Sequence, residues 1–261
     1  MTAAALDAAT APVGADGRFR AELSRDWEIW GPNGGYVASL ALRAAGEVAA
    51  IGRPASISCQ FLRAPDFAPV EIEATVLHGG RRSEAIAVRI VQGGRLVSHA
   101  IVRTAAVAPG YELAHLRAPA VPGPGELRTV GDAPYPFWAN VERRPVPHAG
   151  EEATLREWTR FRPVPTFEDP FVDAARALIL LDTYGWPAAY GEVGEGGDFV
   201  APSLDINAWF HRPAAGAEWL LIDETCTVGA DGLLAAQGHV WDEAGRLIAS
   251  GGAQLCCLPR P

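Results

Sequence analysis

Hydrophobic residues recur along this chain at two spacings, which predict helices in some stretches and strands in others. A stretch that opens at Gly34-Gly35 places apolar residues such as Val37 and Leu40 three to four positions apart, on one face of a helix. A second stretch, after Pro170, repeats this spacing and is apolar nearly all round. The second stretch therefore predicts a buried helix.

Each predicted helix is followed by stretches in which apolar and polar residues alternate. Val70, Ile72 and Val76 alternate with charged or hydroxyl side chains, and a similar run follows at residues 86–90. In the second half, the same period predicts strands near 219–228, 234–241 and 246–257. A period of two is typical of antiparallel strands that bury one face.

The order of these elements repeats within the chain. One predicted strand ends in Phe-x-Arg at Phe61 and another at Phe210, and each is followed by a proline. Each copy later reaches a Gly-Arg-Leu turn, at Gly94 and at Gly245. The sequence therefore predicts an α+β protein built from two tandem copies of one unit. We expect each unit to be a curved antiparallel sheet wrapped around a central helix, because a flat sheet covers only one face of a helix.

A proline-rich segment, residues 108–148, separates the two copies. Proline lacks a backbone donor, so we predict a connector here and not sheet. A further strand, at residues 152–161, is expected to open the second unit. The predicted organisation is a first unit at 1–107, a connector at 108–150 and a second unit at 151–261. The prolines of the segment are Pro109, Pro119, Pro122, Pro124, Pro134, Pro136, Pro145 and Pro147.

Composition narrows the classes of protein to which the chain can belong. It is 49% hydrophobic and 20% charged, as expected of a globular protein. The net charge of −9 argues against nucleic acid as a partner. All 22 basic residues are arginine, which excludes Schiff-base chemistry and a P-loop lysine. No stretch approaches the roughly 20 apolar residues of a membrane span, and the first residues lack a basic signal region, so we expect a cytoplasmic protein without membrane insertion.

Common catalytic and metal-binding motifs are absent from the sequence. No serine has glycine at both −2 and +2, and there is no His-Glu-x-x-His, so neither a nucleophile elbow nor a metal site is predicted. The four cysteines, Cys59, Cys226, Cys256 and Cys257, form no Cys-x-x-Cys pair and are interpreted as small buried hydrophobes. The glycines at 191, 194, 196 and 197 are interpreted as a flexible connector.

Polar residues interrupt the apolar strands of the second half. Asp205 opens an otherwise apolar strand, Thr225 and Thr227 lie two apart, and Gln254 interrupts the last strand. A carboxylate in an apolar strand costs desolvation unless it is paired or exposed. These residues could bring a carboxylate, a hydroxyl and an amide to one water molecule. Each also has a structural interpretation, because an edge aspartate can face solvent and threonine favours strands.

Several segments around these residues resemble the type II acyl-CoA thioesterases, a family of double-hotdog proteins. The resemblance covers residues 19–259 and is weakest in the proline-rich connector. The matching segments are Asn33-Gly34-Gly35-Tyr36-Val37-Ala38, Gln60-Phe61-Leu62-Arg63-Ala64-Pro65, and Ser203-Leu204-Asp205 followed by Trp209-Phe210-His211-Arg212-Pro213.

The resemblance implies an acyl-CoA thioesterase that needs no cofactor beyond the CoA of its substrate. It assigns Asp205 as the general base that activates and orients a water, with a hydroxyl and Gln254 holding that water in line with the carbonyl. The stretch before Gln254 is one residue longer than the family pattern. Counting forward from Trp219 favours Thr227 as the hydroxyl, and counting back from Gly232 favours Thr225, so Thr227 is the first choice and Thr225 the second.

The resemblance leaves alternatives for the role of the glycine pair and for the activity of the chain. Backbone N–H groups near Gly34-Gly35 could stabilise an oxyanion, or these glycines could simply permit close packing of the helix on the sheet. The chain could also be a non-catalytic acyl-thioester binding protein. A hotdog enoyl-thioester hydratase typically needs a histidine near the helix, and neither predicted helix carries one. Because free edges of hotdog sheets pair readily, we expect a homo-oligomer.

Overall fold

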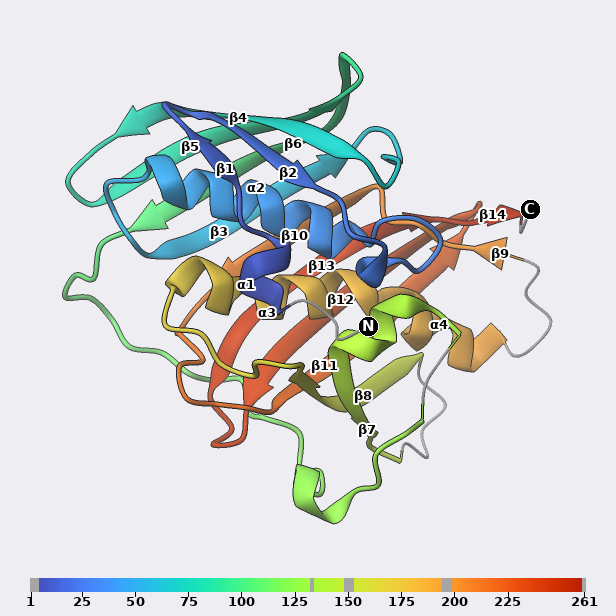
Figure 1. Cartoon of the computed structure of the whole chain (residues 1–261). Helices are drawn as coiled ribbons and strands as arrows, with labels where there is room; N and C mark the ends of the chain where they lie inside the picture. Colours follow the sequence, from blue (N-terminus) through green and yellow to red (C-terminus); the bar gives the residue numbers. More distant parts are fainter. Residues whose placement is uncertain (1–4, 132–133, 148–152, 194–198, 260–261) are drawn as a thin grey trace.

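One large antiparallel sheet wraps around two central helices (Figure 1). The computed structural model describes residues 5–131, 134–147, 153–193 and 199–259, without the side chains of 191–193. The sheet has twelve strands, in the order β1-β2-β4-β5-β6-β3-β10-β13-β12-β11-β8-β7. The chain therefore contains two hotdog units whose sheets are continuous, which confirms the predicted fold class.

Each half of the chain supplies six neighbouring strands of this sheet. The first half supplies β1 (Val13–Ala15), β2 (Arg18–Glu22), β3 (Pro54–Phe61), β4 (Pro69–Gly79), β5 (Ser83–Gln92) and β6 (Arg95–Ala105). The second half supplies β7 (Val141–Pro145), β8 (Thr154–Phe161), β10 (Asp205–Phe210), β11 (Leu220–Ala230), β12 (Leu233–Asp242) and β13 (Leu247–Cys256). A separate two-stranded sheet pairs β9 (Phe199–Val200) with β14 (Leu258–Pro259).

The two predicted helices are present and buried. The helix α2 (Gly34–Val48) begins at Asn33, whose side chain accepts a hydrogen bond from the Tyr36 N–H. The helix α3 (Pro170–Thr183) begins at Asp169, which caps its first turn, and is buried from residue 171 to residue 183. Shorter helices are α1 (Leu6–Ala9), α4 (Gly185–Val193), and the 3₁₀ turns η1 (Arg25–Trp27), η2 (Pro124–Glu126) and η3 (Pro136–Asn140).

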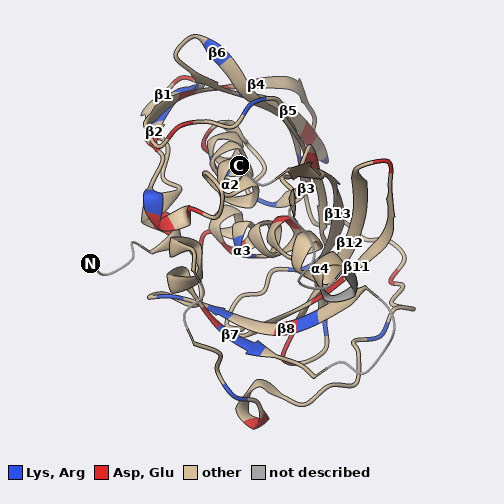
Figure 2. Cartoon of the chain, turned by 90° about the vertical axis from the view of Figure 1, so that its right-hand side faces the viewer, with Lys and Arg blue, Asp and Glu red and all other residues tan. Residues whose placement is uncertain are grey.

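The two halves meet along a seam between β3 and β10. These strands pair antiparallel, with Ile206 opposite Cys59, so the two curved sheets become one. Figure 2 shows α2 and α3 side by side inside the curve of the sheet. The N-terminal turn of α2 lies against the C-terminal part of α3, because a Cβ on Gly35 would come within 2.7 Å of the Ile179 Cα.

The connector contains more regular structure than the prolines indicate. Residues 141–145 form β7, which pairs with β8, so the prediction that this segment contains no sheet is wrong there. The proline of this strand, Pro145, is tolerated because β7 is the last strand of the described sheet and pairs only with β8 there. Residues 118–127 cover an outer cluster that includes Trp158 and Trp241.

Three smaller predictions have mixed outcomes. Gly191 belongs to α4, a helix that the sequence did not predict, whereas Gly194, Gly196 and Gly197 lie outside the described residues. Cys59 is buried as expected, but the other three cysteines are half-buried, and no disulfide forms. No helix in the described part of the chain is long and apolar enough to cross a membrane.

Candidate active site

Asp205 stands at the first position of β10, at one end of the seam. Its Oδ1 accepts a hydrogen bond from the backbone N–H of Gln254 at 3.1 Å, and Gln60 lies opposite it on β3. Just before it, the backbone N–H of Leu204 donates to the Gln254 carbonyl at 2.7 Å. The structure therefore brings Asp205 and Gln254 together, with one carboxylate oxygen acting as an acceptor for the neighbouring strand.

Asp205 and Gln254 project from the outer face of the sheet, away from the helices. On β10 the alternate residues Ile206 and Ala208 are buried against the helices, so Asp205 points to the opposite side. On β13, Gln254 lies between the buried residues Ala253 and Leu255 in the same way. Asp205 and Gln254 are both half-buried, so the outer face at this end of the seam offers a partly screened polar site.

Thr227 lies on the far side of β12 from Gln254. The Thr227 hydroxyl donates to the Ala235 carbonyl at 3.2 Å, and the Gln254 amide donates to the adjacent Leu234 carbonyl at 3.0 Å. Thr227 occupies a β-bulge, where the pairing of β11 with β12 shifts register. The two side chains therefore bond to consecutive carbonyls of β12, one from each side of that strand.

Thr225 does not join this group. Its hydroxyl shares a 2.9 Å hydrogen bond with the hydroxyl of Thr154 on β8, on the side of β11 that faces away from β12. Of the two threonines, Thr227 therefore lies nearer to Gln254.

A second carboxylate, that of Asp182, lies at the same end of the seam but on the inner side of the sheet, between α3 and the first turn of α2. Asp182, on the last turns of α3, is buried, and its Oδ2 accepts the backbone N–H of Gly35 at 2.6 Å. Burial raises the pKa of Asp182 to about 6, although the Ser203 side chain and the Gly35 N–H act in the opposite direction. Its Oδ1 makes no full hydrogen bond within the described part of the chain.

This contact decides between the two interpretations of the glycine pair. The Gly35 N–H already donates to Asp182, so it is not a free oxyanion donor in this structure. A Cβ on Gly35 would lie 2.7 Å from the Ile179 Cα, and one on Gly34 would lie 2.8 Å from Asp182 Oδ2. The glycines therefore permit close packing of α2 on α3, and at Gly34 also on the sheet, where a Cβ would lie 3.1 Å from the ring of Phe61 on β3.

A third buried acid, Glu224, is also turned toward the helices. It is 0% exposed, and neither carboxylate oxygen has a hydrogen-bond partner among the residues described. Burial, together with the charges of Asp223 and Asp182, raises the pKa of Glu224 well above its usual value. Its carboxylate packs on Gly238, where a Cβ would come within 1.7 Å.

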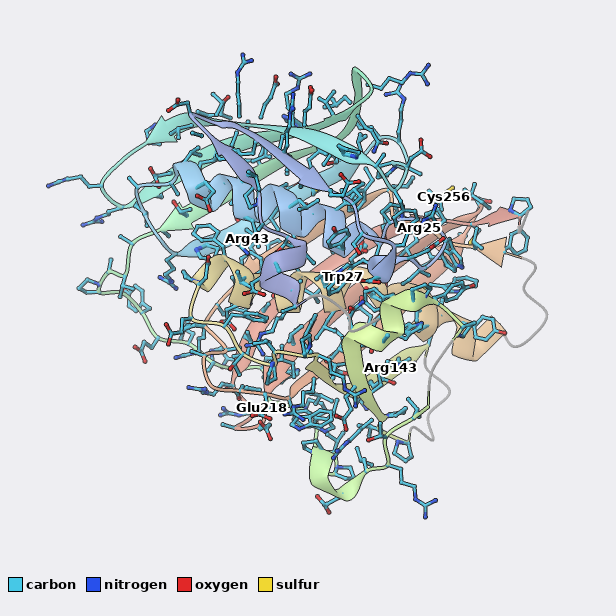
Figure 3. All side chains as sticks on the ribbon, viewed as in Figure 1. Arg25, Trp27, Arg43, Arg143, Glu218 and Cys256 are labelled. Carbon is cyan, nitrogen blue, oxygen red and sulfur yellow. The ribbon has the colours of Figure 1, made fainter. Side chains whose placement is uncertain are left out.

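The neighbouring acid Glu157 shows how a buried carboxylate is normally satisfied. Arg143, on β7 (Figure 3), donates to both oxygens of Glu157 at 2.7 and 3.1 Å, and the Tyr184 hydroxyl donates to one of them. Compared with Glu157, Asp182 and Glu224 are poorly paired, and a poorly paired buried carboxylate costs folding free energy.

The opposite end of the seam is chemically different. There Trp209, 55% exposed, lies opposite Ser56, and the ring of Phe171 packs against Gly46 where the other end has Asp182 against Gly34. Neither of the positions that correspond to Asp205 and Asp182 carries an acid at this end. The structure therefore places the Asp205 and Asp182 pair of carboxylates at only one of the two pseudo-equivalent ends.

Sequence reasoning missed Asp182 and Glu224, although a signal for both was available. Asp182 interrupts a helix that is apolar nearly all round, and Glu224 follows Leu220 and Ile222 on the inward-facing side of its strand. The desolvation argument that selected Asp205 applies equally to them. Within the described ranges, no three His, Cys, Asp or Glu side chains lie close enough together to hold a metal ion.

Comparisons with known proteins point to one family. A family model for the acyl-CoA thioesterase N-terminal domain matches residues 23–108, and one for the C-terminal domain matches residues 114–257. No curated protein sequence matches the chain.

Solved structures of similar shape span the whole chain. A hot dog fold protein from Alicyclobacillus acidocaldarius is 22% identical over 97% of both chains, with a TM-score of 0.86. A tesB protein from Mycobacterium avium subs paratuberculosis is 24% identical, with a TM-score of 0.83, over 97% of this chain and 98% of that one. An acyl-CoA thioesterase II, TesB2, from Mycobacterium marinum is 21% identical over 98% of both chains, with a TM-score of 0.83.

Proposed function

Since this chain belongs to the acyl-CoA thioesterase family and is a thioester hydrolase, we propose that it cleaves its acyl-CoA substrate by direct attack of a water molecule held beside Asp205. The observation that supports this placement is the hydrogen bond from the backbone N–H of Gln254 to the Asp205 carboxylate, which joins two separate strands at one end of the seam. The resemblance assigns both residues to catalysis, and the fold makes them neighbours.

In the proposed reaction, Asp205 takes a proton from the water as the water oxygen bonds to the thioester carbon. The carbon–sulfur bond then breaks, and the proton held by Asp205 passes to the departing thiolate, which leaves the free acid and CoA. Asp205 Oδ1 stays on the Gln254 N–H, so Oδ2 is the oxygen that exchanges the proton. Gln254 and Thr227 hold the water after turning from the β12 carbonyls to which they donate here.

The experiment that tests this mechanism measures thiol release from a panel of acyl-CoA thioesters. Asp205→Asn keeps the shape of the side chain and removes its ability to take a proton, so we expect kcat to fall by roughly 10²- to 10⁴-fold. Thr227→Ala is expected to lower kcat more than Thr225→Ala, because the Thr227 hydroxyl bonds to the strand that the Gln254 amide contacts, whereas the Thr225 hydroxyl bonds to Thr154. Wild-type kcat in Asp205→Asn would reject Asp205 as the base.

We further propose that the protein forms a homo-oligomer in the cytoplasm. Within the described residues, β1 and β7 at the two ends of the sheet each pair with only one other strand, and every residue of β1 is exposed. The four cysteines are all free, which fits a reducing compartment. Light scattering after size-exclusion chromatography tests the first proposal, and a monomeric mass of 27.6 kDa would contradict it.

A further inference from the structure

Asp182 lacks the partners that satisfy three other buried carboxylates of the same fold, a lack that it shares with Glu224. Glu84 accepts hydrogen bonds from the Thr104 hydroxyl and two backbone N–H groups, and Asp242 pairs with Arg246. Asp173, which lies nearer the start of α3, pairs with Arg176. Asp182 has no basic partner among the described residues and holds a single backbone hydrogen bond on one oxygen.

The place of Asp182 links two segments that are far apart in the sequence. Its Oδ2 holds the first turn of α2 through the Gly35 N–H, and its carboxylate lies beside the Ser203 side chain. Ser203 pairs with Leu255 on β13 and stands two residues before Asp205. Both carboxylates also act on the thiol of Cys59, whose pKa they help to raise. Asp182 therefore sits directly behind the segment that carries Asp205.

The segment from Ser203 to Asp205 does not alternate as a regular strand does, so contacts with neighbouring elements hold it in place. The Ser203 side chain lies beside Asp182 on α3, whereas Asp205 faces the outer side of the sheet, so residues 203 and 205 do not share a face as they would in a regular strand. The position of Asp205 is fixed on one side by Gln254. On the other side, the group that meets the segment from within the core is Asp182.

We propose that Asp182 is a positioning residue of the hydrolase, which acts through Ser203 to hold Asp205 in its catalytic place and through Gly35 to lock the first turn of α2 behind it. This proposal rests on the assignment of Asp205 in the proposed mechanism. A displacement of about 1 Å at a reacting group can lower a rate roughly 10²-fold, so a remote contact of this kind has a measurable effect.

Four variants test the proposal by their kcat and KM for acyl-CoA hydrolysis. Asp182→Ala and Ser203→Ala each break the link, so each is expected to lower kcat by about 10- to 100-fold with little change in KM. The double variant is expected to be no slower than the slower single variant, because both remove one connection. Asp182→Asn keeps an acceptor for the Gly35 N–H and is expected to recover much of the lost activity.

Thr183→Ala is the matched control. Thr183 neighbours Asp182 and also ties α3 to the start of α2, by accepting from the Asn33 amide at 3.1 Å, but its hydroxyl donates to the Ile179 carbonyl and not to Ser203. It is therefore expected to leave kcat within about twofold of wild type. An equal loss of kcat in Thr183→Ala would mean that any loosening of this helix junction slows the enzyme, which would overturn the proposal.

Thermal unfolding at pH 7.5 provides a second readout, because a purely structural role of Asp182 predicts the opposite change in Tm. At this pH Asp182 is mostly ionised, because its pKa is about 6, and an ionised carboxylate buried without a basic partner costs stability. Asp182→Asn is expected to raise Tm while kcat stays at or below the wild-type value. A lower Tm for Asp182→Asn would identify a structural tie and overturn the proposal.

The kinetic outcomes separate this proposal from the one on which it rests. Unchanged kcat in Asp182→Ala, or additive losses in the double variant, would reject the positioning role while Asp205→Asn still lost activity. Wild-type kcat in Asp205→Asn would instead reject the assignment of Asp205, and with it the route by which Asp182 is proposed to act.

Discussion

At the scale of single residues, the interior carries acids that lower the stability of the fold. Glu157 is paired with Arg143 and Tyr184, whereas Glu224 is fully buried and its two oxygens have no partner within the described residues. A neutral acid suffers less in such a place than a carboxylate, which is why the pKa of Glu224 is raised. Replacing Glu224 should therefore raise the stability of the fold, whereas replacing Glu157 should lower it.

Glu224→Met is expected to stabilise the protein by about 1–3 kcal/mol at neutral pH, because it removes an unsatisfied buried polar group at similar volume. The sign of the pH dependence follows from the raised pKa. Between the ordinary pKa of a glutamate and the raised value, folded protein binds more protons than unfolded protein, so wild-type stability falls as pH rises. Urea unfolding between pH 5 and pH 8 should show the advantage of the variant growing with pH.

Glu157→Gln is the comparison for this prediction. It breaks a buried pair and leaves Arg143 without its counter-charge, so it is expected to destabilise the fold by about 3–5 kcal/mol. Stability losses of similar size in Glu224→Met and Glu157→Gln would show that Glu224 has a partner, such as a bound water, that satisfies it.

At the scale of elements, the close approach of α2 and α3 determines the geometry at the polar end of the seam. The two helices touch through backbone at Gly35 and Ile179, and this contact brings Asp182 to the first turn of α2. Glycine at position 35 is disfavoured in a helix by about 1 kcal/mol relative to alanine, but it has no Cβ to keep the helices apart. The packing between helices therefore outweighs the local helix propensity.

Gly35→Ala is expected to destabilise the protein by about 1–3 kcal/mol in spite of the better helix propensity of alanine. The added Cβ would lie 2.7 Å from the Ile179 Cα, and backbone cannot turn aside as a side chain can. Gly52→Ala is the control, because no atom lies within 4 Å of the Cβ position at Gly52. Urea denaturation of both variants checks the prediction, and equal stabilities would contradict it.

At the scale of the whole molecule, the two hotdog units share both layers of their structure. The strands β3 and β10 pair along the seam, and α2 packs on α3 across the same boundary. One continuous core includes buried residues of both helices and of both halves of the sheet. Separating the units would therefore expose a strand edge and an apolar helix face on each.

We expect the chain to unfold in one cooperative transition, although it contains two copies of one unit. Loss of either unit removes the seam partner and the helix partner of the other, so partly folded states with one intact unit are unfavourable. Differential scanning calorimetry measures this as a calorimetric enthalpy equal to the van't Hoff enthalpy. Two resolved transitions, each with its own midpoint, would show that the units are independent.

The sequence alone determined the architecture of this protein, because burial patterns are local. The alternation near Val70, the helical spacing after Pro170 and the repeated Phe-x-Arg predicted two helix-plus-sheet units, and α2 and α3 begin where the patterns place them. The sequence underestimated the connector, since a proline does not prevent an edge strand such as β7.

Which polar residues meet was decided by the tertiary structure. Asp205 and Gln254 become neighbours only because β10 pairs with β13, and at the bulge in β11 the hydroxyl of Thr227, not that of Thr225, bonds to β12. Asp182 reaches the same end of the seam because two glycines allow two helices to touch. Strand order, register and helix contact depend on residues far apart in the chain, and such long-range pairings leave no periodic pattern in the local sequence.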